Sequence, residues 1–165
     1  MYIEKMDSLL YLRIAEPVGF RRPLIVGASR KAILAFLPPR EVEGILRAAR
    51  SADGPALRRL RTELARIRRE GYAVGRGETT PGTTGIAAPL FDARGVAVGA
   101  ISVSAPDQRF PEARILDVAV PVPEAARAIS RTLGYVGPAR ADDPRSLRGW
   151  EVRSSGRAEL ARRGR

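Results

Sequence analysis

The stretch Gly71–Pro106, GYAVGRGETTPGTTGIAAPLFDARGVAVGAISVSAP, carries the strongest structural pattern in the chain. Two apolar runs, Gly85–Phe91 and Val96–Ser104, flank the turn-forming residues Asp92–Gly95. A turn of this kind between two strand-like runs predicts a β-hairpin in which Gly95 adopts a positive φ angle. We therefore expect the sheet of the protein to be organised around this hairpin.

The register of the hairpin predicts two chemically different faces. A four-residue loop would pair Phe91 with Val96 and would place Gly85 opposite Ser102. Because strand side chains alternate and opposed residues share a face, small and hydroxyl side chains collect on one side and aliphatic side chains on the other. The first face predicts the floor of a small pocket, although serine and threonine also alternate on strands that simply face water. The expected pocket face comprises Thr83, Gly85, Ala100, Ser102 and Ser104, and the expected aliphatic face comprises Ile86, Ala88, Leu90, Ile101 and Val103.

The composition excludes several classes of enzyme. The chain has 165 residues, the size of one domain with its own core, and contains no cysteine and no histidine. Disulfides, cysteine nucleophiles and serine–histidine triads are therefore excluded, and so are the usual ligands of zinc. A lysine is the remaining base that would activate a serine, and the chain has only Lys5 and Lys31. We expect a protein that is not an enzyme and that binds neither metal nor cofactor.

The net charge is +11, and arginine supplies nearly all of the positive charge. An excess of this size is compatible with binding to nucleic acid or another polyanion. A basic nucleic-acid-binding protein that acts through the arginine-rich helix at 55–70 and the C-terminal tail is therefore the alternative hypothesis. Glu41, Glu43, Glu63 and Glu70 are interleaved with the arginines. This mixture favours a solvated surface of both signs.

The sequence shows no signal for a membrane. No apolar run reaches the ~20 residues of a bilayer-spanning helix. Glu4, Lys5 and Asp7 stand where a signal peptide would need an apolar core. We expect a cytoplasmic protein without a membrane partner.

The remaining elements follow from periodicity, proline and glycine. The loop at 75–84 lacks the glycine–lysine pattern of a nucleotide-phosphate loop, and its glycine and threonine content fits either a lid over the pocket or a floppy connection. The predicted strands are 2–5, 9–14 and 72–74; the predicted helices are 29–37, 39–50, 55–70 and a helix from Pro111 to Gly134 that breaks near Pro121 and Pro123. This order predicts an α+β fold in which helices pack against an antiparallel sheet.

The start of the predicted helix 29–37 is a candidate site for an anion. Ser29 is a plausible N-cap, and Pro38 ends the helix. Unpaired backbone N–H groups and a partial positive charge at a helix start attract carboxylate or phosphate, and Arg30 and Lys31 would add to this if they point inward. Every helix has such an end, however, and most of them bind only water.

A set of short motifs follows along the chain in a fixed order. They are Arg22-Pro23-Leu24, Lys31–Pro38 (KAILAFLP), Leu64–Val74 ending in GYAV, Pro81-Gly82, Ala87–Asp92 (AAPLFD), Gly95 and Ile101–Pro106 (ISVSAP). No single motif is specific, but together they resemble the C-terminal effector-binding domain of IclR-type bacterial transcriptional regulators. The resemblance covers roughly Tyr2 to Tyr135.

This resemblance implies a GAF-like antiparallel sheet with flanking helices and a pocket for a small metabolite, often a carboxylate or an aromatic acid. Gly75 and Gly85 stand where the family often has an acidic residue and a cysteine or other small residue, and Ile25 and Arg30 replace the usual histidine and glycine. These departures allow a roomier or a degenerate pocket. Carried over residue by residue, the implied ligand-binding residues are Ala28, Ser29, Gly75, Gly85, Ser102 and Ser104.

The resemblance also implies a non-enzymatic domain that senses a small organic acid and self-associates as a homo-oligomer. Family members carry an N-terminal winged helix-turn-helix that reads DNA, whereas this sequence begins inside the effector domain. We therefore expect an effector-binding domain at 1–135, truncated at its N-terminus, and a basic, disordered tail at 136–165. DNA would be a partner only if a longer product or another protein supplies the helix-turn-helix, and a lost strand would expose a sheet edge.

Overall fold

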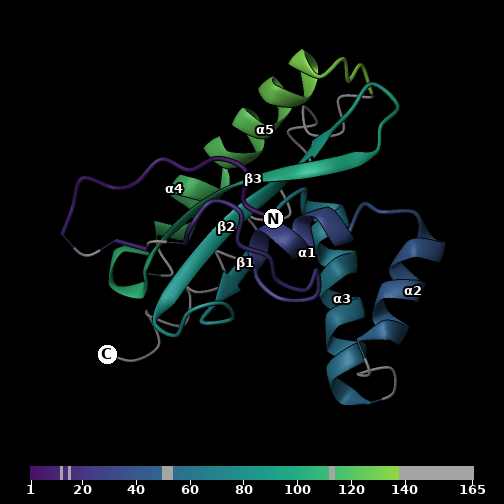
Figure 1. The fold of residues 1–165 in the computed structure, drawn as a ribbon, viewed down its shortest axis with the longest axis horizontal. Helices are drawn as coiled ribbons and strands as arrows, with labels where there is room; N and C mark the ends of the chain where they lie inside the picture. The colour runs from purple at the N-terminus through teal and green to yellow at the C-terminus, as the bar shows by residue number, and fades with distance from the viewer. Residues whose placement is uncertain (12, 15, 50–53, 112–113, 138–165) are drawn as a thin grey trace, which may run out of the picture.

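The computed structural model describes residues 1–11, 13–14, 16–49, 54–111 and 114–137 of the chain. In this part, three antiparallel strands form a sheet in the order β1-β2-β3 with helices on both sides, which confirms the predicted α+β class (Figure 1). The strands are β1 (Ala73–Arg76), β2 (Thr83–Phe91) and β3 (Ala97–Pro106), the helices are α1 (Ala28–Leu34), α2 (Pro39–Ala48), α3 (Pro55–Glu70), α4 (Ile115–Ala119) and α5 (Pro121–Thr132), and a 3-10 turn covers Asp107–Arg109.

The turn between β2 and β3 forms where the sequence predicts it. The Gly95 N–H donates to the Asp92 carbonyl at 2.9 Å, and the Asp92 N–H donates to the Val96 carbonyl at 3.0 Å. Gly95 has a φ of 75°, the left-handed conformation that glycine adopts without a steric penalty. The Asp92 carboxylate reinforces the turn because it accepts the N–H groups of Arg94 and Val96, both at 2.9 Å. The hairpin and its positive φ angle are confirmed.

The predicted register of the hairpin is wrong by two residues. Gly85 lies opposite Ser104, not Ser102, and Ser102 lies opposite Ala87. One residue of the shift arises because Asp92 itself pairs with Val96, and the other arises from a β-bulge at Leu90/Phe91. Because the shift is even and side chains alternate with period two, every residue keeps its predicted face.

Different helices cover the two faces of the sheet (Figure 1). The residues that pack with α1 and α3 are on the face with Ala87 and Ala100, and those that pack with α4 and α5 are on the face with Ile86 and Ala88. Val103 pairs with Ile86 but is 43 % exposed, because β3 lies at the edge of the sheet. The first core contains Ala28, Ala32, Leu34, Leu64, Ile67, Ala73 and Ala87, and the second contains Tyr72, Ile86, Ala88, Phe110, Ile115, Val122 and Ala126.

The two strands predicted at 2–5 and 9–14 are wrong. The described residues before α1 contain no strand, although the N–H of Tyr2 donates to the Phe20 carbonyl and the N–H of Gly19 donates to the Tyr2 carbonyl. Met6, Leu9 and Tyr11 are exposed. Alternating side chains indicate which residues would share a face of a strand, but a strand also needs a neighbour for its backbone groups. The segment contacts another loop instead.

Helix boundaries agree with the sequence where proline or glycine specifies them. Pro55 opens α3, and Gly71 ends it with a φ of 80°. The predicted break is found before Pro121, which opens α5, but Pro123 lies in the first turn of α5 and does not break it. The helix expected from Pro111 begins only at Ile115. The predicted N-cap Ser29 is wrong, because α1 begins at Ala28 after Gly27 and already ends at Leu34. The predicted tail lies outside the described residues from position 138 onward.

The hairpin turn should make stability depend on pH. Hydrogen bonds from Val96 and Arg94 hold the pKa of the Asp92 carboxyl below its ordinary value. A group with a lowered folded pKa contributes stability above its unfolded pKa and loses it as pH falls through the folded pKa. We therefore expect the wild type to lose more stability than Asp92→Asn between about pH 5 and pH 2. Urea denaturation across this range measures the difference, and parallel pH curves for the two proteins would refute it.

Candidate functional site

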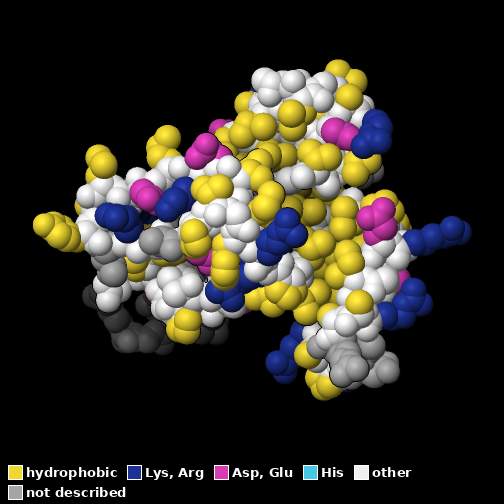
Figure 2. Space-filling model, viewed as in Figure 1, with side chains coloured by type: hydrophobic (Ala, Val, Ile, Leu, Met, Phe, Trp, Pro, Cys, Tyr) yellow, Lys and Arg dark blue, Asp and Glu magenta, His cyan; other side chains and the backbone are white. Residues whose placement is uncertain are grey.

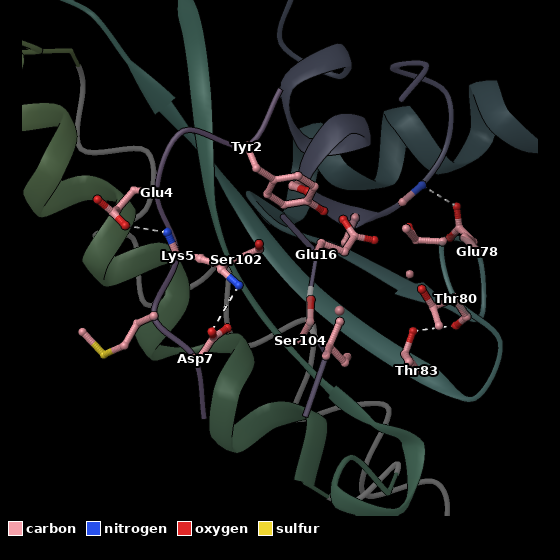
Figure 3. Close-up of a pocket in the computed structure, with 18 residues that line it drawn as sticks. Tyr2, Glu4, Lys5, Asp7, Glu16, Glu78, Thr80, Thr83, Ser102 and Ser104 are labelled. Carbon is pink, nitrogen blue, oxygen red and sulfur yellow. Dashed lines mark hydrogen bonds and ion pairs between the residues drawn. The ribbon is translucent and has the colours of Figure 1, made fainter. Parts of the chain in front are cut away.

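A cavity of about 180 Å³ lies between the start of α1, the sheet and the N-terminal segment (Figure 3). All six residues implied by the family resemblance line it: Ala28, Ser29, Gly75, Gly85, Ser102 and Ser104. Thr83 of the expected pocket face lines it too, whereas Ala100 packs against the first core. The structure therefore brings the sequence-selected residues together in one place.

Small residues let α1 approach the sheet closely at this cavity. A side-chain carbon on Gly75 would lie 3.0 Å from the backbone nitrogen of Ala28, and one on Gly85 would lie 3.1 Å from the Ser104 hydroxyl. Gly27 has a φ of 85°, and a side chain there would meet Thr79 at 2.7 Å. The alternative of a roomier pocket beside Gly75 does not hold, because the backbone of α1 takes up that space.

The carboxylate of Glu78 occupies the start of α1. Its Oε2 accepts the N–H of Gly27 at 3.0 Å, and its Oε1 accepts a hydrogen bond from Lys31 Nζ at 2.6 Å. The Glu78 Oε1 also lies 3.0 Å from the place where a side-chain carbon of Gly75 would be. The loop between β1 and β2 is thus joined to α1 by an ion pair, and one expected anion-binding N–H group already has a carboxylate partner.

The two cations at the start of α1 do not line the cavity. Lys31 is 2 % exposed and donates to Glu63 of α3 as well as to Glu78. Arg30 is 7 % exposed, and its Nη1 donates to the Val26 carbonyl at 2.8 Å. Both side chains therefore join parts of the protein and do not point freely into the cavity.

The N-terminal segment forms one wall of the cavity. The Arg30 guanidinium lies over the Tyr2 ring, and its Nη2 lies 3.9 Å from Glu16 Oε2. Burial, followed by a hydrogen bond with Glu16, raises the pKa of the Tyr2 hydroxyl. Tyr2 therefore keeps its proton across the ordinary pH range, and its hydroxyl accepts a hydrogen bond from Arg30 Nη2 at 3.4 Å.

Sequence reasoning missed the charged residues of the cavity. Glu4, Lys5, Asp7 and Glu16 reach it from the N-terminal segment, and Glu78 reaches it from the loop. Only Glu78 had a local signal, as the one acidic residue in the loop at 75–84. Across the described residues, no group of three or more acidic side chains is arranged to hold a metal ion.

The arginine-rich helix α3 has a surface of mixed sign. Arg61 donates to Glu43 at 2.5 and 2.7 Å, Arg66 pairs with Glu70 at 2.9 Å, and Arg68 donates to a backbone carbonyl of α1's C-terminal end. Figure 2 shows blue and magenta side chains scattered among apolar ones on this face of the molecule. The nucleic-acid alternative is therefore not favoured.

Comparison with known proteins shows the family. Residues 1–131 match the model of the bacterial transcriptional regulator IclR C-terminal domain. The chain is 34 % identical over 140 residues to the HTH-type transcriptional regulator KdgR of Escherichia coli and 37 % identical over 140 residues to BhcR of Paracoccus denitrificans. These matches cover 82 % and 75 % of the chain but 53 % and 50 % of the relatives, so the chain spans about half their length.

Solved structures agree with this assignment. The IclR structure of Thermotoga maritima superposes with a TM-score of 0.72 at 32 % identity, covering 80 % of this chain and 56 % of that one. The C-terminal domain of a transcriptional regulator from Vibrio cholerae gives 0.67 at 38 % identity, covering 76 % and 75 %. The chain thus has the fold of a C-terminal domain of bacterial transcriptional regulators. The chain belongs to the IclR family and corresponds to its C-terminal domain.

No helix in the described part of the chain is long and apolar enough to span a membrane.

The Lys31 ion pairs should contribute measurably to stability. Lys31→Met leaves Glu63 and Glu78 without their shared cation, and we expect a loss of about 2 kcal/mol. That is less than the ~3–5 kcal/mol of fully buried pairs, because the two carboxylates remain 28 % and 30 % exposed. Glu78→Gln should cost less, since Lys31 keeps Glu63. Chemical denaturation measures both losses.

Arg69→Met provides the matched control for Lys31→Met. Arg69 pairs with Glu70 but its side chain is 68 % exposed, so its removal should change stability by about 0–0.5 kcal/mol. Equal losses of stability in Lys31→Met and Arg69→Met would show that the buried ion pairs of Lys31 stabilise the fold no more than an exposed ion pair does.

Proposed function

We propose that this domain binds a small organic acid in the cavity between α1 and the sheet, and that the bound acid regulates a transcription factor of the IclR family. The observation that carries the proposal is the convergence of Ala28, Ser29, Gly75, Gly85, Ser102 and Ser104 on one cavity. Its volume of about 180 Å³ is below the ~300–1,000 Å³ of pockets for drug-sized ligands. A metabolite of a few heavy atoms fits this size.

Hydroxyl groups supply most of the uncharged donors in the cavity. Ser102 and Ser104 stand two residues apart on the same face of β3 (Figure 3), and Ser29 at the start of α1 lines the same cavity. Hydroxyl donors form short hydrogen bonds to carboxylates. Lys5 lines the same cavity and adds a cation, which is shared with Asp7 at 3.1 Å. These groups would hold the carboxylate of the acid.

The loop between β1 and β2 connects the cavity structurally to the rest of the domain. Thr79, Thr80 and Glu78 line the cavity, and Glu78 is bonded to α1 through Gly27 and Lys31. An acid bound beside the start of α1 would compete electrostatically with Glu78 for its donors. Binding would thereby change the contact between the loop and α1, as a lid does.

The wider assignment follows from the relatives. They are transcriptional regulators, which supports a non-enzymatic role without metal or cofactor. We propose a cytoplasmic domain at 1–135 that forms homo-oligomers, with a basic tail at 136–165. DNA binding would come from a helix-turn-helix domain supplied by a longer product or a partner. That helix-turn-helix domain would determine the operator and the regulated genes.

Isothermal titration of the full chain with small keto, hydroxy and aromatic acids tests the binding proposal. Removing one hydroxyl that bonds to a carboxylate costs about 1.5 kcal/mol, or roughly tenfold in affinity. We expect Ser102→Ala and Ser104→Ala each to weaken binding by about tenfold, and the double variant by more.

Thr62→Val serves as the control, because it removes a hydroxyl that is bonded to the Arg58 carbonyl on α3, outside the cavity. It should leave the affinity unchanged. The proposal fails if no acid binds the wild type, or if an acid binds the serine variants as tightly as the wild type.

A further inference from the structure

Glu16 differs from the other carboxylates of the cavity in having a buried oxygen without a donor. Its side chain is only 16 % exposed, and Oε2 is buried and accepts no hydrogen bond from any group in the described part of the chain. The nearest cation, Arg30 Nη2, lies 3.9 Å away, which is too far for a hydrogen bond. The Tyr2 hydroxyl interacts with the Glu16 carboxylate, but it does not bond to Oε2. A buried acceptor left in this way costs about 1–3 kcal/mol, so a donor from a ligand would be favourable.

The other carboxylates of the cavity already have partners. Both oxygens of Glu78 accept hydrogen bonds, from Gly27 and Lys31. Asp7 accepts from Lys5 Nζ at 3.1 Å, and Glu4 is exposed and accepts the Lys5 N–H at 2.8 Å. Glu16 is therefore the carboxylate of the cavity that a hydrogen-bond donor of a ligand would stabilise.

The surroundings of Glu16 indicate which kind of donor fits. A ligand carboxylate there would meet the negative charge of Glu16 and would be repelled. A ligand ammonium would meet the guanidinium of Arg30, which is 7 % exposed and already faces Glu16. A neutral hydroxyl is repelled neither by the carboxylate of Glu16 nor by the guanidinium of Arg30. It would donate to Oε2 and leave the Glu16–Arg30 charge balance unchanged.

Glu16 and the serines of β3 lie on different sides of the cavity, so each side can bind a different end of the ligand. Figure 3 places Glu16 beside the Tyr2 ring, on the side of the cavity formed by the N-terminal segment, whereas Ser102 and Ser104 come from β3. A carboxylate held by the serines would thus leave the remainder of a small molecule free to extend toward Glu16. The cavity offers hydrogen-bonding groups for both ends.

We propose that Glu16 is a specificity-determining residue that accepts a hydrogen bond from a hydroxyl of the effector, so that the cavity selects hydroxylated small acids over their unhydroxylated counterparts. This inference rests on the proposed binding of an organic acid. A site built to bond a hydroxyl discriminates against the analogue that lacks it, because the buried polar group is then left unpaired. For one hydrogen bond to a charged acceptor, the preference is about 10- to 100-fold in affinity.

Matched pairs of acids test this inference by isothermal titration of the full chain. The pairs are lactate with propionate and malate with succinate, and alanine is compared with lactate to separate an ammonium from a hydroxyl. We expect the wild type to bind the hydroxylated member of at least one pair about tenfold or more tightly than its counterpart. Glu16→Gln should reduce this preference several-fold, while the unhydroxylated member keeps its affinity.

Glu41→Gln is the control, because Glu41 on α2 is exposed and does not line the cavity. It removes the same charge and should leave the preference unchanged. Thermal melting establishes that each variant folds. If Glu16→Gln does not fold, Glu16→Asp, which retains the carboxylate on a shorter arm, should fold and show a weakened preference.

Each outcome of the titrations decides one of the two proposals. Acids that bind the wild type without a preference for the hydroxyl, or a preference that Glu16→Gln retains, overturn the role of Glu16 while the binding of acids stands. Tighter binding of alanine than of lactate overturns the assignment of a hydroxyl. If no member of any pair binds, the acid-binding function and the inference built on it both fail.

Discussion

The buried ammonium group of Lys31 holds together three segments that are far apart in the sequence. The lysine belongs to α1, and it donates to Glu63 on α3 and to Glu78 in the loop between β1 and β2. Burying an ammonium group without partners is costly, so α1 packs against the sheet favourably only when both carboxylates come within reach. Formation of the α1–sheet core and placement of the loop are therefore coupled, and the cavity lies where these segments meet.

Close approach of α1 to the sheet is the second constraint on the cavity. Ala28 approaches β1 closely because Gly75 has no side chain, and a side-chain carbon there would lie 3.0 Å from the Ala28 backbone nitrogen. The positive φ of Gly27 turns the chain into α1 at that point, and a side chain there would have to displace side-chain atoms of Arg30 and Thr79. The result is a cavity whose sheet side carries hydroxyl groups and whose opposite wall, from the N-terminal segment, carries Glu16. The proposed roles of serine and glutamate follow from this division.

Much of the fold could be predicted from the sequence because its signals are local. Pro55 and Gly71 delimit α3 through their own backbone preferences, and Asp92–Gly95 forms the predicted turn. The strands predicted before α1 failed because side-chain alternation does not supply a neighbouring strand. The predicted hairpin register was wrong because a bulge at Leu90/Phe91 has no clear signature in the sequence. The predicted faces were nevertheless correct because the total shift was even.

The candidate site could be predicted only in part. The serines of β3 and the glycines of β1 and β2 were selected through motifs and strand period, and the structure gathers them on one cavity. Glu16 and Glu78 escaped prediction because each reaches the cavity from a segment without a regular pattern. Arg30 and Lys31 were correctly noted at the start of α1, but they bond to distant residues and do not face the cavity.

The sequence by itself determined which side chains share a face of the hairpin and where α3 begins and ends, because strand period and backbone φ preferences act over a few residues. The tertiary structure decided which charges are neutralised and which acceptor is left open inside the cavity. Lys31 meets its partners across 32 and 47 residues of chain, and Gly27 meets Glu78 across 51. Such pairings depend on distances between packed segments, and local sequence patterns carry no information about those distances.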